Sequence, residues 1–217
     1  GTISASGGSG AVSSNQAGGG SGGRIALYYG TESFAGDITA YGGEGYRYSA
    51  AGTIYKEGSG DINGTMIVDN DGHTSNAAMT SFAVESSIFD AVELSRTWVG
   101  FGAQTAFSAA QFTAVTGTVI FDVPSDSTAL PVFDAVDILS GATLTQSYTA
   151  AFNRMAFKVT GDMTVASGGL VAVDASGYAS TSGPGAGAAG SYAGGGGGYG
   201  GAGGMAYNGS AGGPAYE

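Results

Sequence analysis

Short apolar runs alternate with glycine, serine and aspartate along the middle of the chain. Val, Ile, Thr and Phe are frequent in these runs, which is typical of β-strands. The glycines and aspartates between the runs indicate turns, because they accept backbone conformations that other residues avoid. The pattern predicts an all-β protein with short, closely spaced strands.

The tetrapeptide Phe-x-Ala-Val recurs at Phe89, Phe112 and Phe133. A degenerate copy begins at Phe157. The copies lie about 22 residues apart, and each interval holds two or three apolar runs. A repeat of this length and content is typical of one coil of a parallel β-helix, in which inward side chains stack from coil to coil. We expect the phenylalanines to point inward and to stack on one face of successive coils.

The repeat predicts a parallel β-helix with glycine-rich terminal segments. A β-sandwich is the alternative, because it also contains short strands at regular intervals, but it does not explain why the same tetrapeptide returns. We expect residues 1–60 to form glycine-rich strands and corners, and residues 61–180 to form the coils. Residues 181–217 are expected to form a glycine- and tyrosine-rich C-terminal segment of the same continuous domain.

A second repeat lies near the N-terminus. Residues 1–10 (GTISASGGSG) and residues 36–45 (GDITAYGGEG) are identical at six of ten positions. A β-prone run follows each copy, at residues 24–29 and at residues 53–56. We therefore expect each copy to form a strand followed by a glycine-rich corner.

Composition narrows the classes of function. The chain has no cysteine, which excludes a disulfide framework and zinc sites built on thiolates. Its net charge of -11, with only 6 Lys and Arg residues, argues against a nucleic-acid-binding surface. No apolar run is long enough to predict insertion into a membrane. Few lysines, together with much Gly, Ser, Thr, Ala and Tyr, indicate an extracellular protein of the cell surface.

Several strings resemble those of large glycine-rich bacterial surface proteins that are predicted to form parallel β-helices. These strings include GGGSGGRIALYY, GDITAYGG, AGTIYKEG, GTMIVDNDG and VTGDMTVASGGLVAVDASGY. In that group such strings recur along very long chains, so this chain is similar to one repeat module. The resemblance extends over most of the sequence. It implies an extracellular, structural or adhesive role and no catalytic residues.

One turn carries a group of oxygen-bearing side chains. Asp69, Asn70 and Asp71 are consecutive, and calcium prefers such oxygen ligands. Asp69 and Asp71 are therefore candidate calcium ligands, and calcium is the only candidate cofactor. The remainder of a calcium loop is missing, since Thr80 stands where an EF-hand has glutamate. An Asx-type turn is the simpler interpretation, with His73 as an exposed turn residue.

The sequence does not indicate an enzyme. A serine hydrolase needs a histidine base and a nucleophile elbow, whereas this chain has one histidine and no G-x-S-x-G motif. Paired carboxylates can cleave polysaccharides. The candidates for such a pair are better explained as solvated strand ends and corners; they are Asp122, Asp126, Asp134 and Asp137.

We therefore expect a non-catalytic structural subunit or repeat of an extracellular fibre, sheath or adhesin. A β-helix without capping segments leaves unpaired strands at its ends. This predicts head-to-tail contact between copies, as a homo-oligomer or as tandem repeats. The alternative is a carbohydrate- or receptor-binding adhesin tip with surface glycans as partners. Trp98 and Phe101 are then candidate sugar-stacking residues, although core packing also explains them. A polysaccharide-degrading β-helix enzyme is the third hypothesis.

Overall fold

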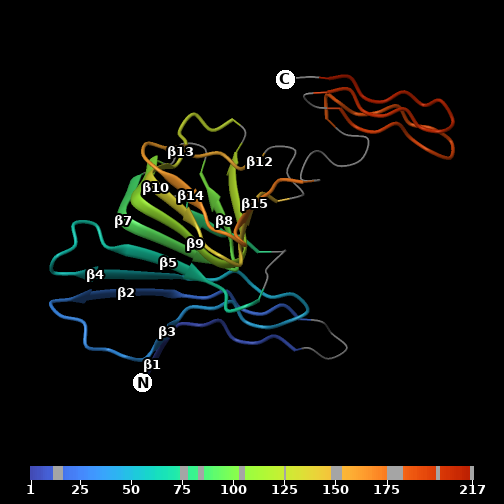
Figure 1. Ribbon diagram of the computed structural model, residues 1–217. Helices are drawn as coiled ribbons and strands as arrows, with labels where there is room; N and C mark the ends of the chain where they lie inside the picture. Colours follow the sequence, from blue (N-terminus) through green and yellow to red (C-terminus); the bar gives the residue numbers. More distant parts are fainter. Residues whose placement is uncertain are drawn as a thin grey trace. The chain divides into compact units, whose positions relative to one another are not determined.

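The structure is a computed structural model, and its described residues are 1–11, 17–73, 78–82, 86–102, 106–124, 126–147, 153–174, 183–198 and 201–215. All elements in these ranges are strands, and stacked parallel strands form a parallel β-helix of about five turns (Figure 1). The predicted fold class is confirmed, and the sandwich alternative is wrong. Within the same ranges there is no helix that could span a membrane.

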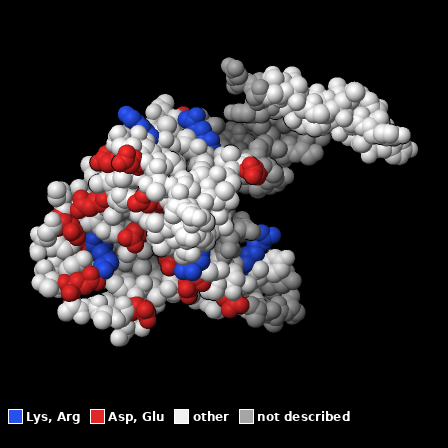
Figure 2. Space-filling model, viewed as in Figure 1, with Lys and Arg blue, Asp and Glu red and all other residues white. Residues whose placement is uncertain are grey.

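The chain forms two compact units. The first consists of Gly1–Gln146 and Asn153–Val173, and the second of Ser147–Phe152 and Asp174–Glu217. The first unit thus joins the N-terminal glycine-rich range to the coils, and most of the second is the glycine- and tyrosine-rich segment. Acidic side chains are spread over the first unit, whereas residues 183–215 carry no charged side chain (Figure 2).

The coils are built from strands that mostly pair in parallel with the coil before and the coil after. These strands are β5 (Thr65–Asp69), β6 (Thr80–Phe82), β7 (Ser86–Ser95), β8 (Trp98–Phe101), β9 (Ala106–Pro124), β10 (Val132–Ile138), β11 (Ala142–Thr145), β13 (Lys158–Val159), β14 (Met163–Val165) and β15 (Leu170–Val171). A short strand, β12 (Asn153–Arg154), runs antiparallel to the end of β9.

A full coil bends at two corners and therefore has three faces. The long strand β9 shows both bends, because its first part pairs with β7 and β10 and its last part with β8 and β11. At the first corner the pairing between strands skips Asp90, Ala110 and Asp134. Three short strands per coil are what the sequence predicts.

The second corner uses the left-handed backbone conformation. The residues that adopt it in four successive coils are Arg96, Gly117, Gly141 and Gly168, with φ between 47° and 84°. The amide of Gly117 donates to the carbonyl of Gly141, and the amide of Gly141 donates to that of Gly168, both at 2.9 Å. Glycine adopts this conformation at little steric cost. The backbone conformation of this corner therefore explains why three of the four positions are glycine, and Arg96 is the exception.

Inward side chains of the coils form one continuous apolar core. Val92, Phe112 and Val136 lie above one another in β7, β9 and β10, and all three are buried. Aromatic rings fill the centre, with centroids 4.7 to 6.4 Å apart in contacting pairs. Such pairs add about 0.5–1.5 kcal/mol each beyond area burial. The rings are those of Phe82, Phe89, Phe101, Phe107, Phe112, Phe121, Phe133 and Phe157.

The four phenylalanines of the repeat all belong to this cluster, but the single stack predicted for them is wrong. Phe89 and Phe133 both pair with Ala109, so Phe112 lies three positions further along β9. The coil between β7 and β9 advances by 20 residues, from Phe89 to Ala109, whereas the tetrapeptide returns after 23. Phe157 precedes β13 and packs against Phe133 at 5.9 Å from the side. Unequal coil lengths explain the difference.

The N-terminal strands are β1 (Thr2–Ser4), β2 (Arg24–Tyr29), β3 (Asp37–Thr39) and β4 (Thr53–Gly58). The repeated decapeptides lie side by side, since β1 and β3 pair in parallel with Ile3 opposite Ile38. The strands that follow them, β2 and β4, also pair in parallel. The chain then reverses, because β4 and β5 are antiparallel with Ile54 opposite Ile67. β4 therefore covers the edge of β5, and β2 is the last strand at this end of the large sheet.

Four extended stretches form the N-terminal glycine bundle: residues 5–10, 17–23, 39–45 and 46–52. Their hydrogen bonds advance in steps of three, since the amides of Ala17, Gly20 and Gly23 donate to the carbonyls of Ala11, Gly8 and Ala5. Three residues per turn is the repeat of the polyproline II helix. A Cβ at Gly7 would lie 1.9 Å from the Gly20 carbonyl oxygen, so interior positions exclude side chains.

The second unit contains a bundle of the same kind, the C-terminal glycine bundle, formed by residues 185–190, 193–198, 203–207 and 209–214. Its hydrogen bonds also advance by three. The amides of Gly195 and Gly198 donate to the carbonyls of Ala188 and Gly185 at 2.9 and 2.8 Å. In both terminal segments, backbone hydrogen bonds therefore hold the extended stretches of a bundle together.

Candidate functional site

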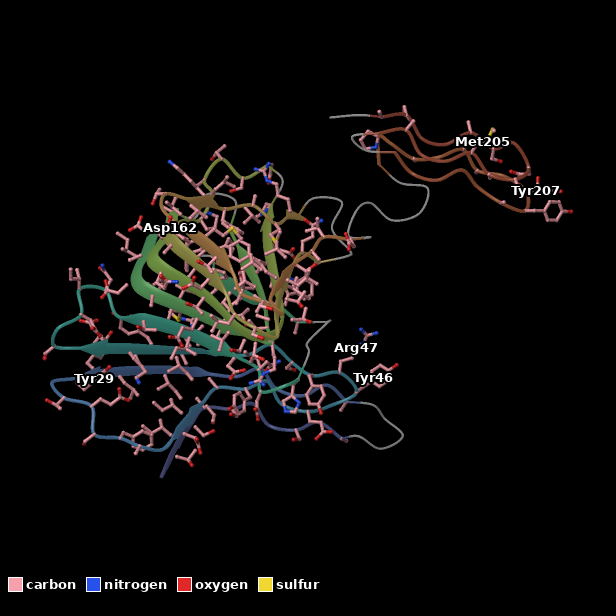
Figure 3. The ribbon with its side chains drawn as sticks, viewed as in Figure 1. Tyr29, Tyr46, Arg47, Asp162, Met205 and Tyr207 are labelled. Atoms are coloured by element: carbon pink, nitrogen blue, oxygen red, sulfur yellow. The ribbon has the colours of Figure 1, made fainter. Side chains whose placement is uncertain are left out.

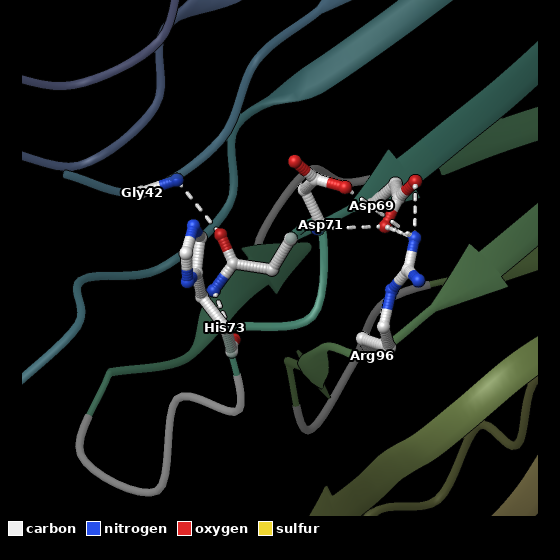
Figure 4. Close-up of polar contacts among 6 residues, drawn as sticks. Gly42, Asp69, Asp71, His73 and Arg96 are labelled. Carbon is white, nitrogen blue, oxygen red and sulfur yellow. Dashed lines mark hydrogen bonds and ion pairs between the residues drawn. The ribbon is translucent and has the colours of Figure 1, made fainter. Parts of the chain in front are cut away.

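Three charged side chains meet where β5 ends, and Asp69, Asp71 and Arg96 are called the polar corner below (Figure 4). Nη2 of Arg96 lies 3.1 and 3.2 Å from the two carboxylate oxygens of Asp69 and 3.9 Å from Oδ1 of Asp71. The amide of Asp71 donates to Oδ1 of Asp69 at 2.9 Å, which is the predicted Asx turn.

The position of Arg96 depends on the coil that follows. A Cβ at Gly117 would lie 2.4 Å from Cγ of Arg96, so the arginine stem passes directly over this glycine. Nε of Arg96 is buried and has no hydrogen-bond partner among the described residues. The polar corner therefore requires glycine at position 117 for two reasons: its positive φ and the space for the Arg96 stem.

Asn70 connects the polar corner to the N-terminal glycine bundle. Its side chain is buried; Oδ1 accepts from the amide of Gly42 at 2.7 Å, and Nδ2 donates to the carbonyls of Ser49 and His73 at 3.1 and 2.8 Å. The ring of His73 stacks on Tyr48 with centroids 4.1 Å apart. His73 is thus a half-buried residue that packs between two segments, not an exposed turn residue.

The calcium interpretation of Asp69 and Asp71 has to compete with Arg96, whose guanidinium already contacts both carboxylates. Calcium takes about six to eight oxygen ligands. Across the described ranges, no three His, Asp or Glu side chains are arranged to hold a metal ion. Calcium binding stays a prediction of the sequence, and a calcium-dependent rise in Tm that Asp69→Ala abolishes would establish it.

The two candidate sugar-stacking residues differ in exposure. Phe101 is 6% exposed, and its ring contacts those of Phe82, Phe107 and Phe121, so neither face is open to a sugar. The core-packing interpretation holds for it, and the sugar-stacking one is wrong. Trp98 is half-buried, and its indole N–H donates to the buried carboxylate of Asp122 at 2.7 Å.

The other carboxylates considered for polysaccharide cleavage lie at strand ends and corners. Oδ1 of Asp134 accepts from the hydroxyl of Thr160 at 2.7 Å, and Oδ2 of Asp137 accepts from Nε2 of Gln111 at 3.0 Å. Asp126 is exposed in the turn that follows β9. These contacts connect neighbouring coils, which agrees with the structural interpretation.

The last coil, made by β13, β14 and β15, is called the open coil. Its strands pair only with β10 and β11 of the coil before, and no described strand pairs with their other edge. Met163 and Val165 pair with the buried Val136 and Ile138, yet they are 43% and 48% exposed. Leu170 on β15 is also exposed. These side chains occupy stacking positions that a further coil would cover.

The C-terminal glycine bundle ends in a compact pair of turns, called the tyrosine tip, that displays Tyr192 and Tyr207. Both tyrosines are fully exposed, and Figure 3 shows Tyr207 projecting from the bundle. Nδ2 of Asn208 donates to the carbonyl of Ala193 at 2.9 Å, which ties the two turns together. The amide of Ser210 donates to Oδ1 of Asn208 at 3.1 Å and fixes the second turn.

Known proteins give no further guide to these features. No protein-family model, curated protein or solved structure matches the chain. The assignment of function therefore depends on the geometry of this chain alone.

Sequence reasoning did not single out Met163, Val165, Leu170 or the tyrosine tip. The alternation in Met163-Thr164-Val165 is the same as in a half-buried strand, so only the position of β14 in the last coil reveals its exposure. The sequence showed that this segment is rich in glycine and tyrosine, but it did not show the hydrogen bond that joins the two turns.

Proposed function

We propose that this chain is a non-catalytic structural module of an extracellular fibre, sheath or adhesin, and that modules associate through the open coil. The observation that carries the proposal is the single-sided pairing of β13, β14 and β15, with Met163 and Val165 exposed at stacking positions. An unpaired strand edge with apolar side chains is a template for another strand.

The other end of the large sheet offers a matching surface for a second copy. Its terminal strand, β2, pairs only with β4 within the described ranges, and Tyr28 on β2 is exposed. Contact between β2 of one copy and the open coil of the next joins two different surfaces. Such a contact does not close on itself unless its rotation forms a ring, so it produces filaments or extended arrays.

The test is to place a charge on the open coil. Lysine on an edge strand opposes pairing with another chain, so Val165→Lys is expected to keep the protein monomeric. Ile62→Lys is the matched control, because Ile62 is a solvent-exposed aliphatic residue in the loop between β4 and β5. We expect the unmodified chain and this control to form elongated oligomers in sedimentation velocity and electron microscopy. A wild-type chain that stays monomeric at high concentration contradicts the proposal.

The tyrosine tip favours a second candidate function, an adhesin tip that binds neutral glycans or a receptor. Its turns, residues 190–193 and 206–210, contain Tyr, Ser, Gly, Ala and Asn. Tyrosine beside small polar residues supplies large contact area at low entropic cost, as in antibody loops. The bundle that carries the tip has no charged residue between positions 183 and 215, which favours an uncharged ligand.

Glycan-array binding by the intact chain tests this second function. We expect Tyr192→Ser and Tyr207→Ser each to reduce binding at least about tenfold, which corresponds to about 1.4 kcal/mol. Tyr46→Ser is a control at an exposed tyrosine of the first unit. Equal binding by all three variants, or no binding by the unmodified chain, argues against a glycan-binding tip.

A further inference from the structure

A cleft of about 380 Å³ opens between β3, β4 and β5 in the first unit. Its size falls within the usual range of small-ligand sites, about 300–1,000 Å³. The aliphatic part of its lining comes from one isoleucine on each strand: Ile38, Ile54 and Ile67. Phe34 and Tyr41 add aromatic rings. The cleft can therefore hold an apolar chain beside aromatic faces.

Most charged groups in the cleft are already paired. Nζ of Lys56 lies 2.7 Å from Oε1 of Glu32, and the Asp69 carboxylate is held by Arg96. Asp37 also lines the cleft, and its carboxylate makes no ion pair or hydrogen bond among the described residues. Among the carboxylates of the cleft lining, these pairings leave only that of Asp37 without an ion pair to a described residue.

Tyr41 also lines the cleft, and nearby carboxylates act on its hydroxyl, those of Asp71 and Asp69 most strongly and that of Asp37 least. Burial raises the pKa of the Tyr41 hydroxyl, and the carboxylates of Asp71, Asp69 and Asp37 raise it further, while Arg96 opposes them. Negative charge near a phenol disfavours the phenolate, and it favours a cation in the same place. The walls of the cleft thus combine a negative potential with aromatic rings that can contact a cation.

We propose that this cleft binds an alkylammonium group, as carried by a lysine side chain or by a free aliphatic amine. The alkyl chain packs on the three isoleucines, and the ammonium group donates to the Asp37 carboxylate beside Phe34 and Tyr41. This recognition lies beyond the proposed structural role, because neither the open coil nor the tyrosine tip contributes a residue to the cleft.

The chemistry favours an ammonium ligand over a neutral sugar. A sugar site needs several free hydrogen-bonding groups around one ring face, whereas Glu32, Lys56 and Asp69 are occupied by one another or by Arg96. The unpaired carboxylate of Asp37 and the three isoleucines in the same lining match the one charge and the aliphatic stem of an alkylammonium group.

The test is an NMR titration of the intact, isotope-labelled chain at neutral pH. The probes are n-pentylamine, which is protonated, its neutral analogue n-pentanol, Nα-acetyl-lysine amide and methyl glucoside. We expect both ammonium probes to shift the amides of residues 34–41 and 54–56, with a Kd on the order of 1 mM. Stronger binding of the lysine derivative identifies a peptide ligand, and stronger binding of pentylamine a free amine.

Two variants separate recognition from folding. Asp37→Asn keeps the shape of the side chain and is expected to weaken ammonium binding about tenfold. Its NMR spectrum is expected to keep the signal dispersion of the folded protein. Asp162→Asn, at an exposed position beside β14 and outside the cleft lining, is expected to leave affinity unchanged. Equal binding of pentanol and pentylamine, preferential binding of the glucoside, or full affinity in Asp37→Asn overturns the proposal.

Discussion

The coils and the glycine bundles are both held by hydrogen bonds between extended stretches, but they fill their interiors in opposite ways. In the coils, rings such as Phe112, Phe121 and Phe133 occupy the centre and are fully buried. In the bundles, backbones approach until there is no space for a Cβ; at Gly203 an added Cβ would lie 2.0 Å from the Gly196 carbonyl oxygen.

This difference shows that one chain uses two sources of stability. Burial of apolar side chains stabilises the coils at roughly 25 cal/mol per Å². The bundles bury little side chain, so they rely on backbone hydrogen bonds whose net contribution is about 0.5–1.5 kcal/mol each. Coils and bundles should therefore respond differently to the same kind of substitution, and four experiments test this expectation.

The largest effect is expected in the aromatic core. Phe112→Ala removes a fully buried ring and is expected to lower the free energy of unfolding of the first unit by about 3–5 kcal/mol. Guanidinium unfolding followed by fluorescence of Trp98, the one tryptophan in the chain, measures it. Amide signals of residues 185–213 are expected to stay unchanged.

Ile88→Ala is the matched control, because Ile88 on β7 is 58% exposed and its loss should change stability by only about 0.5 kcal/mol. If Phe112→Ala and Ile88→Ala were equally mild, the aromatic rings would not be the main source of stability in the coils.

The sequence predicted that the coils form a parallel β-helix, but it did not predict which residues pair between neighbouring coils. The period of Phe-x-Ala-Val identified a β-helix, because stacked coils repeat inward apolar positions. It could not place Phe112, because the offset between paired residues of neighbouring coils varies from 19, at Thr80 and Val99, to 27, at Val136 and Met163. Loops of different length between strands absorb this variation, and their lengths carry no simple signal in the apolar pattern.

The next effect tests whether the bundles are packed. Gly203→Ala is expected to destabilise the C-terminal glycine bundle by about 1–3 kcal/mol, because the new Cβ meets the neighbouring backbone. Gly204→Ala should be neutral or slightly stabilising, since nothing lies within 4 Å of a Cβ there. Amide hydrogen exchange of Gly196 and Gly213 measures the difference. Identical exchange in the two variants would mean that the stretches are not packed as described.

The packing of the glycine tracts could not be predicted from the sequence. Crowded glycines recur in steps of three, as at Gly7 and Gly10 or at Gly195 and Gly198. This spacing is the signal of a three-residue repeat, but other glycines lie between and hide it. A flexible linker and a packed bundle therefore have almost the same composition, and only the hydrogen-bond partners distinguish them.

A smaller effect is expected at the second corner. Two variants there separate the need for a positive φ from the need for space beside the glycine. Gly117→Ala introduces strain at φ 65° and a clash with the Arg96 stem, whereas Gly141→Ala at φ 81° introduces strain alone. The strain costs roughly 1–2 kcal/mol, so Gly141→Ala should lose about that much and Gly117→Ala more. Thermal unfolding measures both variants. Equal losses would show that Arg96 moves away freely and that the polar corner does not require Gly117.

The candidate sites were predictable only in part. Asp69 and Asp71 were found from residue type, and the Asx turn followed from their spacing. Their partner Arg96 lies 27 residues further along the chain from Asp69 and is brought there by one coil of the β-helix. The cleft and the open coil depend in the same way on which strands become neighbours, so residue type alone did not reveal them.

The smallest effect concerns pH and the first corner. Oδ2 of Asp90 accepts hydrogen bonds from the amides of Asn63, Ile62 and Gly64 at 2.9–3.1 Å, and these bonds, that of Asn63 foremost, lower the pKa of Asp90. A depressed pKa means that the folded state favours the carboxylate. The stabilisation is therefore complete above the unfolded pKa, about 3.9, and is lost as the pH falls through the folded value.

Asp90→Asn is accordingly expected to lower Tm at pH 7 by less than Gly117→Ala does, and the gap to the unmodified chain should narrow as the pH falls below the unfolded pKa. Asp162→Asn, an exposed residue outside this loop, controls for the loss of one acidic group. Thermal scans between acidic and neutral pH measure the gap for both variants. A gap that stays constant across this range would mean that the shape of the Asp90 side chain, and not its charge, holds residues 62–64. Corner residues of the coils would then act through geometry alone, as the glycines of the bundles do.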